Sequence, residues 1–205
     1  MTRSTAGILL ALSLIGTAQA AGTQRVPFPQ GGTIRLENST GYLTVEGWDE
    51  PAVEIIAVQT LPEVRVAVER RSENELAIST SFPARRKLLI FPREINVDYT
   101  VRIPRNSRLV VRHNNGCVLV SGVTGNIDIR SHTGDVIVTL PDPGPYSIDA
   151  RSRLGNVTSD FAGEVHSRFL IGTYLGNTGE VPSHRIYLRI GRGSIAVKKD
   201  PPLRP

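Results

Sequence analysis

The stretch NIDIRSHTGDVIVTL, residues 126–140, alternates apolar and polar residues on both sides of Gly134. Ile127 and Ile129 precede the glycine at the spacing of a strand, and two valines follow it in the same way. Because side chains of a strand alternate between its two faces, these four apolar residues point to one side. The stretch therefore predicts two short strands joined at a glycine turn.

The same pattern recurs around four other glycines: Gly41, Gly116, Gly155 and Gly193. Inward places are expected seven and five residues before each glycine, and two and four residues after it. Nineteen of these twenty places are apolar, and Ser159 is the exception. The central glycines are 18 and 21 residues apart. A period of this length, made only of strands and turns, is typical of a repeat fold whose copies bury their apolar faces by stacking.

We therefore predict an all-β fold, a parallel β-solenoid or β-helix of short rungs with a period of about 18–21 residues. The alternative is an antiparallel β-sandwich, in which each repeat is a hairpin. Between Gly155 and Gly193 there is room for two rungs, so a degenerate rung is expected around Gly172, with Val165 and Arg168 in the matching columns.

Residues 62–108 interrupt the period. EVRVAVERR and ELAIST alternate on either side of SEN and predict a hairpin, and INVDYTVRIP predicts a further strand that ends at Pro104. Between them lies FPARRKLLIFP, a basic segment bounded by prolines that predicts a loop or edge segment. We interpret 62–108 as an antiparallel insertion that caps the first end of a single repeat domain, residues 21–199.

The segment VDYTVRIPRNSRLVVRHNNGCVLVSGVTGNIDIRSHTGDVIVTL, residues 97–140, resembles the bacterial putative-adhesin family, a group of exported β-strand-repeat domains of unknown function. GTIRLENSTGYLTVEGWDE and RIYLRIGRGSIAVKK are similar to the first and last elements of that family, so the resemblance covers roughly residues 30–199. The resemblance implies the fold and export, and it implies no catalytic or binding residues.

The first twenty residues have the features of a secretory signal peptide. Arg3 precedes an apolar run from Ala6 to Ile15, and Ala18-Gln19-Ala20 is an A-x-A cleavage site. Cleavage near Ala20 predicts an extracytoplasmic protein, periplasmic or secreted. No later segment is apolar over the roughly 18 residues that a membrane helix requires, and residues 200–205 are expected to be a disordered tail.

One outward column of the repeat is basic. Four residues before four of the glycines stand Arg112, Arg130, Arg151 and Arg189, with Glu37 in the first copy. Asp128 and Asp149 stand two residues before two of these arginines. Guanidinium groups in a row match carboxylates, sulfates or phosphates spaced along a polymer. These four arginines are the candidate ligand-binding residues, and the expected partners are acidic polysaccharides or envelope lipid head groups. Nucleic acid is not expected, because few aromatic residues accompany the basic ones.

The sequence predicts no enzyme, cofactor or metal site. H-E-x-x-H, G-x-S-x-G and phosphate-binding glycine motifs are missing. His113 and His132 stand beside the turns without companions, so we expect solvated turn residues. The single cysteine, Cys117, falls in an outward polar column and is expected to be an inert surface thiol.

These observations favour an exported, non-catalytic, adhesin-like protein of the cell envelope. The alternative is a β-helix polysaccharide lyase or hydrolase that would use Asp128, Asp149, Arg130 and Arg151, since a glycosidase needs two neighbouring carboxylates.

Overall fold

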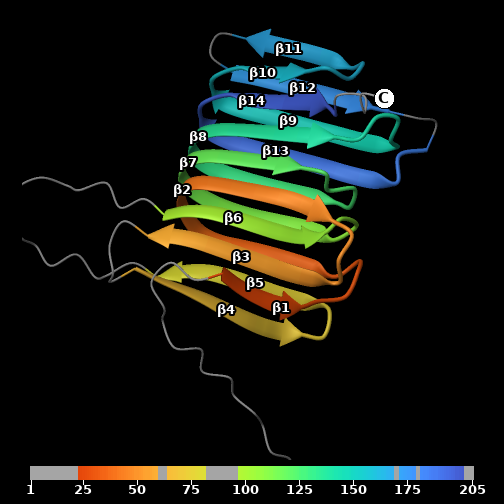
Figure 1. Cartoon of the computed structure of the whole chain (residues 1–205). Coiled ribbons are helices and arrows are strands. Elements are labelled where there is room, and N and C mark those ends of the chain that lie inside the picture. The colour runs from red at the N-terminus through yellow and green to blue at the C-terminus, as the bar shows by residue number, and fades with distance from the viewer. Residues whose placement is uncertain (1–22, 60–63, 82–96, 169–170, 179–180, 201–205) are drawn as a thin grey trace, which may run out of the picture.

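The computed structural model describes residues 23–59, 64–81, 97–168, 171–178 and 181–200. These residues form fourteen strands and no helix (Figure 1), so no described segment is a helix long and apolar enough to cross a membrane. The predicted signal peptide, the basic segment 82–92 and most of the predicted tail lie outside the described residues.

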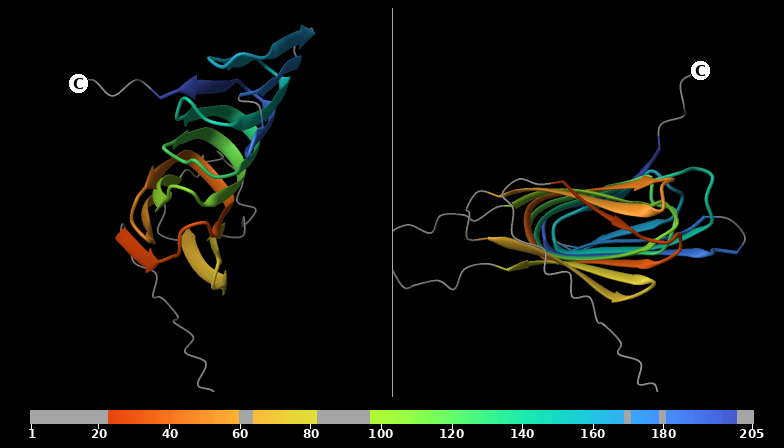
Figure 2. Two further views of the ribbon diagram at one scale, coloured as in Figure 1. Left: turned by 90° about the vertical axis from the view of Figure 1, so that its right-hand side faces the viewer. Right: turned by 60° about the horizontal axis from the view of Figure 1, so that its bottom comes forward.

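Three long strands form the centre of the structure: β2 (Thr33–Trp48), β7 (Arg108–Ser121) and β8 (Ile127–Leu140). Each strand bends at its glycine into a first and a second arm. The three strands pair in parallel and in register, with Gly41 opposite Gly116 and Gly116 opposite Gly134. The first arms stack in one layer and the second arms in another, with the bend joining the layers (Figure 2). The glycines of the sequence repeat therefore mark the bends of the strands, and at these bends each repeat stacks directly on the next.

The last repeat of the chain lies between two earlier ones. Its arms are β13 (His184–Arg192) and β14 (Ile195–Lys199), and the arms of the preceding repeat are β9 (Tyr146–Leu154) and β10 (Val157–Ser159). β13 pairs in parallel with both β8 and β9, and β14 pairs in parallel with both β8 and β10 (Figure 1). The stacking order thus differs from the chain order.

The segment around Gly172 is not a rung, so that prediction is wrong. β12 (Ile171–Asn177) runs antiparallel to β9, where Gly172 lies opposite Ser152, and β11 (Glu164–Arg168) runs antiparallel to β12. The 38-residue gap between Gly155 and Gly193 is therefore filled by an edge hairpin. The repeat that follows it returns to the stack one level below β9.

Residues 64–104 are only partly antiparallel, contrary to our interpretation of 62–108. β4 (Arg65–Ser72) and β5 (Glu75–Ser81) form the predicted antiparallel hairpin. However, β5 pairs in parallel with the first arm of β2, and β6 (Val97–Pro104) pairs in parallel with its second arm. We call one pair of arms in the stack a level. β5 and β6 take the places of the first and second arms of one more level, which lies below β2.

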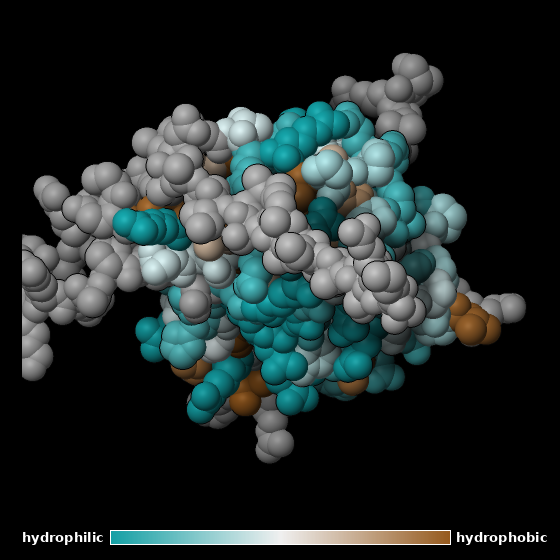
Figure 3. All heavy atoms as spheres, turned by 90° about the horizontal axis from the view of Figure 1, so that it is seen from below, coloured by the Kyte–Doolittle hydropathy of each residue, from teal (hydrophilic) through white to brown (hydrophobic). Residues whose placement is uncertain are grey.

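The lower end of the stack is closed by antiparallel strands. β3 (Ala52–Gln59) pairs with β6, and β1 (Thr23–Pro27) pairs with β3. β4 forms the other lower edge and exposes Arg65, Glu69, Arg70 and Arg71. Seen from this end, the described surface is mostly hydrophilic (Figure 3). Charged edge strands of this kind disfavour pairing with another chain.

The core lies between the two layers of arms. All nineteen apolar residues of the predicted inward columns are buried, and Ser159 is half-buried. They form part of one continuous hydrophobic cluster along the stack. No single repeat could bury these residues alone, so burial depends on the stacking of neighbours.

The corner glycines are required by the closeness of the levels. Gly134 has a φ of 117°, in the region that only glycine adopts readily. A Cβ atom on Gly134 would lie 1.6 Å from the carbonyl oxygen of Gly116, and one on Gly193 would lie 1.6 Å from that of Gly134. Both distances are far shorter than any contact that a real Cβ atom makes. The atoms in the way belong to the backbone, which cannot move aside as a flexible side chain can. A side chain at these corners would push neighbouring levels apart.

Gly134→Ala is expected to lower the free energy of unfolding by more than about 4 kcal/mol, because it adds a backbone clash to the strain of a positive φ. Gly31→Ala is the matched control, since Gly31 also has a positive φ of 77° but has open space at its Cβ position. It should cost about 1–2 kcal/mol. Chemical denaturation of both variants checks this, and equal losses would show that the contact between corners is unimportant.

Candidate functional site

The four predicted arginines lie in one outward row on the layer of first arms. Arg112 pairs in register with Arg130, Arg130 with Arg189, and Arg189 with Arg151. The row is therefore continuous across β7, β8, β13 and β9. Neighbouring strands are about 4.8 Å apart, so four guanidinium groups emerge along one line. Stacking in chain order would place Arg189 beyond Arg151, whereas in the structure it lies between Arg130 and Arg151.

The two aspartates of this face engage three of the four arginines. Asp128 Oδ1 accepts a hydrogen bond from Arg112 Nη1 at 3.1 Å and lies 3.6 Å from Arg130 Nε. Asp149 Oδ2 accepts one from Arg189 Nη2 at 2.6 Å. Arg151 has no carboxylate partner within 4.0 Å among the described residues. The row is thus partly neutralised, and its charges are not equivalent.

Tyr187 occupies the centre of this face and was missed by the sequence analysis. It lies in register between Asp128 and Asp149, in the outward column two residues before the arginine column. Three guanidinium groups surround its ring: those of Arg189, Arg185 and Arg130 lie 4.0, 5.0 and 5.4 Å from the ring centroid. Such contacts hold the cations near an aromatic surface. The sequence did contain one clue to Tyr187. It occupies the repeat position at which the two neighbouring repeats have Asp128 and Asp149.

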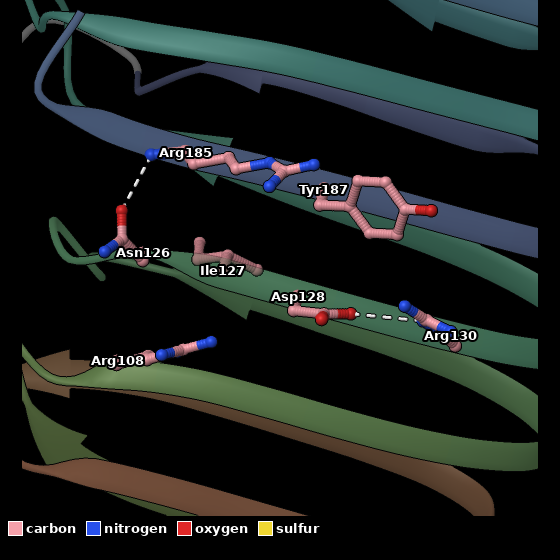
Figure 4. Close-up of a pocket in the computed structure, with 7 residues that line it drawn as sticks. All are labelled: Arg108, Asn126, Ile127, Asp128, Arg130, Arg185 and Tyr187. Carbon is pink, nitrogen blue, oxygen red and sulfur yellow. Dashed lines mark hydrogen bonds and ion pairs between the residues drawn. The ribbon is translucent and has the colours of Figure 1, made fainter.

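A hollow of about 310 Å³ opens beside Tyr187 (Figure 4). Two further arginines line it, Arg108 from β7 and Arg185 from β13, and both are exposed. Asn126 lies between their strands, and its Oδ1 accepts a hydrogen bond from the backbone N–H of Arg185 at 2.8 Å. The remaining lining residues are Ile127, Asp128 and Arg130. We call the six outward arginines Arg108, Arg112, Arg130, Arg151, Arg185 and Arg189, together with Asp128, Asp149 and Tyr187, the arginine face.

A second hollow, of about 520 Å³, lies farther along the same row. In register, Arg151 is followed by Thr173 of β12 and then by His166 of β11. Both residues line this hollow together with Arg151, Arg153, Ile171, Arg189 and Ile190. The polar row therefore continues past the four arginines to the upper edge of the stack.

The two aspartates are not neighbours, which bears on hydrolysis. Asp128 and Asp149 are separated by the strand that carries Tyr187, so their backbones are about 9.6 Å apart at two strand spacings. Each carboxylate is also held by at least one arginine. No observation at this face favours a lyase or hydrolase over a binding surface.

His113 is buried, so its prediction as a solvated turn residue is wrong. Only 3% of its surface is exposed, and its Nδ1 lies 2.8 Å from the Ser39 hydroxyl. Its Nε2 has no hydrogen-bond partner among the described residues. His132, by contrast, is exposed. Burial lowers the pKa of His113 to about 4 by disfavouring the charged imidazolium.

Cys117 is half-buried, and burial raises the pKa of its thiol, with the charge of Asp135 acting in the same direction. A raised pKa keeps the sulfur as the less reactive thiol at neutral pH. Within the described ranges, no group of three His, Cys, Asp or Glu residues could hold a metal ion.

The pKa of His113 predicts a loss of stability in mild acid. The unfolded chain, with a histidine pKa near 6.5, binds a proton as the pH falls below that value, whereas the folded protein does so only near pH 4. The free energy of unfolding should therefore fall by up to about 3 kcal/mol between pH 6.5 and pH 4. Denaturation at several pH values checks this. His113→Gln, which has no titratable group, should lose this part of the pH dependence, and an unchanged pH profile would contradict the assignment.

Two solved structures that match most of the chain are bacterial proteins named as a putative cell adhesion protein and a putative adhesin. A putative cell adhesion protein from Clostridium sporogenes is 14% identical, with a TM-score of 0.52, and the match covers 88% of this chain and all of that one. A putative adhesin from Bacteroides fragilis is 13% identical, with a TM-score of 0.34 over 88% of this chain and 98% of that one. No family model matches the sequence, and no curated protein matches it. The Clostridium structure supports the fold that the resemblance to the putative-adhesin family implied.

Proposed function

We propose that this protein is an exported, non-catalytic, adhesin-like module of the bacterial cell envelope that binds acidic polymers through the arginine face. The observation that carries the proposal is the in-register row of four arginines across β7, β8, β13 and β9. The fold likeness to a bacterial cell adhesion protein is consistent with it. The candidate polymers are acidic polysaccharides, with envelope lipid head groups as the other anionic surface.

The fold that we infer for this module is a parallel β-solenoid with two-armed rungs. The two arms of one repeat pair with the matching arms of neighbouring repeats, whereas a sandwich of hairpins requires them to pair with each other. A stack of identical levels repeats its surface at a fixed interval, so one outward residue type becomes a line. This is the geometry that a long, regularly charged ligand needs.

The charge balance of the arginine face favours an anionic partner. The arginine face holds six arginines and two aspartates, so these residues together carry four net positive charges. Two unit charges about 5 Å apart repel by about 3 kcal/mol at an effective dielectric constant near 20. An anionic polymer relieves this repulsion at several levels at once. Guanidinium groups also bind carboxylates and sulfates with two parallel hydrogen bonds.

Export is part of the proposal and has its own test. Cleavage after Ala20 should give a mature chain that begins at Ala21. N-terminal mass spectrometry of protein expressed in a Gram-negative host and recovered from the periplasm or medium should find this terminus. Recovery of the protein only from the cytoplasm, with residues 1–20 intact, would contradict export.

Arg130→Gln combined with Arg151→Gln should weaken binding to a polyuronate about tenfold or more, because both residues act on one line of polymer. The salt dependence of binding should also fall, since fewer counterions are released. Isothermal titration calorimetry at two salt concentrations measures both effects.

The control for this pair is Arg65→Gln combined with Lys198→Gln. Both residues are exposed and lie away from the arginine face. Their substitution removes the same number of positive charges as the substitution of Arg130 and Arg151. The control should bind like the wild type. If the two double variants bind equally weakly, net charge rather than the arginine face attracts the polymer.

A further inference from the structure

We propose that the hollow beside Tyr187 is a subsite for one acidic sugar unit, whose carboxylate or sulfate is held by Arg108 and Arg185. This inference rests on the proposed function and deepens it, because it says which part of the arginine face recognises the ligand and which chemistry it selects. Neither of these two arginines belongs to the column that the sequence analysis identified.

The two arginines at this end of the hollow are Arg108 of β7 and Arg185 of β13. Arg112, Arg130 and Arg189 each have an aspartate partner, whereas these two have no carboxylate within 4.0 Å among the described residues. A guanidinium that already binds a carboxylate must share or exchange that partner before it can bind a ligand. Arg108, Arg185 and Arg151 can each bind an anion without such an exchange, and two of them, Arg108 and Arg185, line the same hollow beside Tyr187.

The positions of the two arginines suit a single anionic group with its sugar ring. They precede Leu109 and Ile186, which both pair in register with Ile127 of β8, the strand that lies between β7 and β13. Their backbones are therefore about 9.6 Å apart at two strand spacings. Long side chains that start from this separation can reach one group from two sides. In Figure 4 the two side chains lie on opposite sides of Asn126 and Ile127 and extend in the same direction along their strands.

Asn126 adds a neutral donor at the same end. Its Oδ1 is occupied by the backbone N–H of Arg185, which orients the side-chain amide and leaves Nδ2 to donate. This end of the hollow therefore presents guanidinium and amide N–H groups. Donors without a competing acceptor select the oxygen-rich end of a ligand.

The opposite end of the hollow carries charges of both signs. Asp128 lies there, beside Arg130 and the ring of Tyr187 (Figure 4). Its carboxylate is contacted by Arg112 and Arg130, and its remaining lone pairs can accept hydrogen bonds from hydroxyl groups. A sugar unit with one carboxylate or sulfate and several hydroxyls matches this arrangement.

Tyr187 provides a flat aromatic wall, and the hollow provides little other apolar surface. Its ring is half-buried at the edge of the hollow, and the other apolar lining residue, Ile127, is only 1% exposed. An acyl chain would find no apolar floor here, so the site favours a hydrophilic ring over a lipid. Small polar ligands are held in such sites by a few placed polar groups and one apolar contact.

The test compares Arg108→Gln combined with Arg185→Gln against the wild type and against the Arg65→Gln, Lys198→Gln control. The probes are an oligogalacturonate, a sulfated oligosaccharide, a neutral dextran oligomer, inorganic sulfate and vesicles of anionic phospholipid. Binding is measured by calorimetry, and thermal melting verifies that each variant is folded. We expect the wild type and the control to bind at least one acidic oligosaccharide at least tenfold more tightly than dextran or sulfate. The Arg108, Arg185 variant should lose at least tenfold of that affinity.

Two substitutions at Tyr187 test the aromatic wall separately. Tyr187→Phe keeps the ring and should bind the oligosaccharide within about twofold of the wild type. Tyr187→Leu removes the ring and should bind it at least fivefold more weakly. Equal binding by both variants would overturn the role of the ring.

The remaining outcomes separate the subsite from the proposed function. If the Arg108, Arg185 variant binds like the wild type while the Arg130, Arg151 variant binds weakly, the subsite is wrong and the proposed function stands. If neither variant weakens binding to an acidic polymer, or if the wild type binds none, both are wrong. Preferential binding to anionic vesicles, or equal affinity for sulfate and the oligosaccharides, would overturn the sugar subsite.

Discussion

The structure depends on the close approach of glycine backbones at the corners of the stack. Gly116, Gly134, Gly193 and Gly155 lie on one another, and a Cβ atom on each of the last three would meet the carbonyl group of its neighbour. Only glycine allows levels to approach at strand spacing while the chain turns between the two layers. These contacts also set the register, because a shift by one residue would move a side chain into the corner and turn the inward face outward.

Register at the corners determines the chemistry of the surface. Once the glycines are aligned, residues at equal distances from them form rows, and the apolar rows fill the core between the layers. The same alignment places the arginines in one outward row and Asp128, Tyr187 and Asp149 in the next. Because these two rows are adjacent, the two aspartates form ion pairs with arginines of the outward row. The same adjacency determines which arginines have a carboxylate partner and which do not. The constraint that allows the fold thus also arranges the candidate binding site.

Much of this arrangement could be predicted from the sequence, because spacing within a repeat is local information. The inward columns and the outward position of the arginines follow from alternation around each glycine. The order of the levels could not be predicted in this way, since spacing does not say which strand lies on which. The return of β13 between β8 and β9 depends on contacts far apart in the sequence. It explains why Arg189 lies between Arg130 and Arg151, and why the segment around Gly172 is an edge hairpin rather than a rung. Tyr187 was overlooked because its importance comes from the arginines of neighbouring strands. His113 was misjudged because the inward place beside the corner is not one of the four apolar columns.

The order of the levels is the claim on which the arginine face depends, and nuclear magnetic resonance tests it most directly. In an isotope-labelled sample, nuclear Overhauser contacts between backbone protons report which strands are adjacent. The account predicts contacts from the residues around Arg189 in β13 to those around Arg130 in β8 and to those around Arg151 in β9, with none joining β8 directly to β9. Direct contacts between β8 and β9 would contradict it, because the repeats would then stack in chain order and the row of arginines would have a different sequence of neighbours.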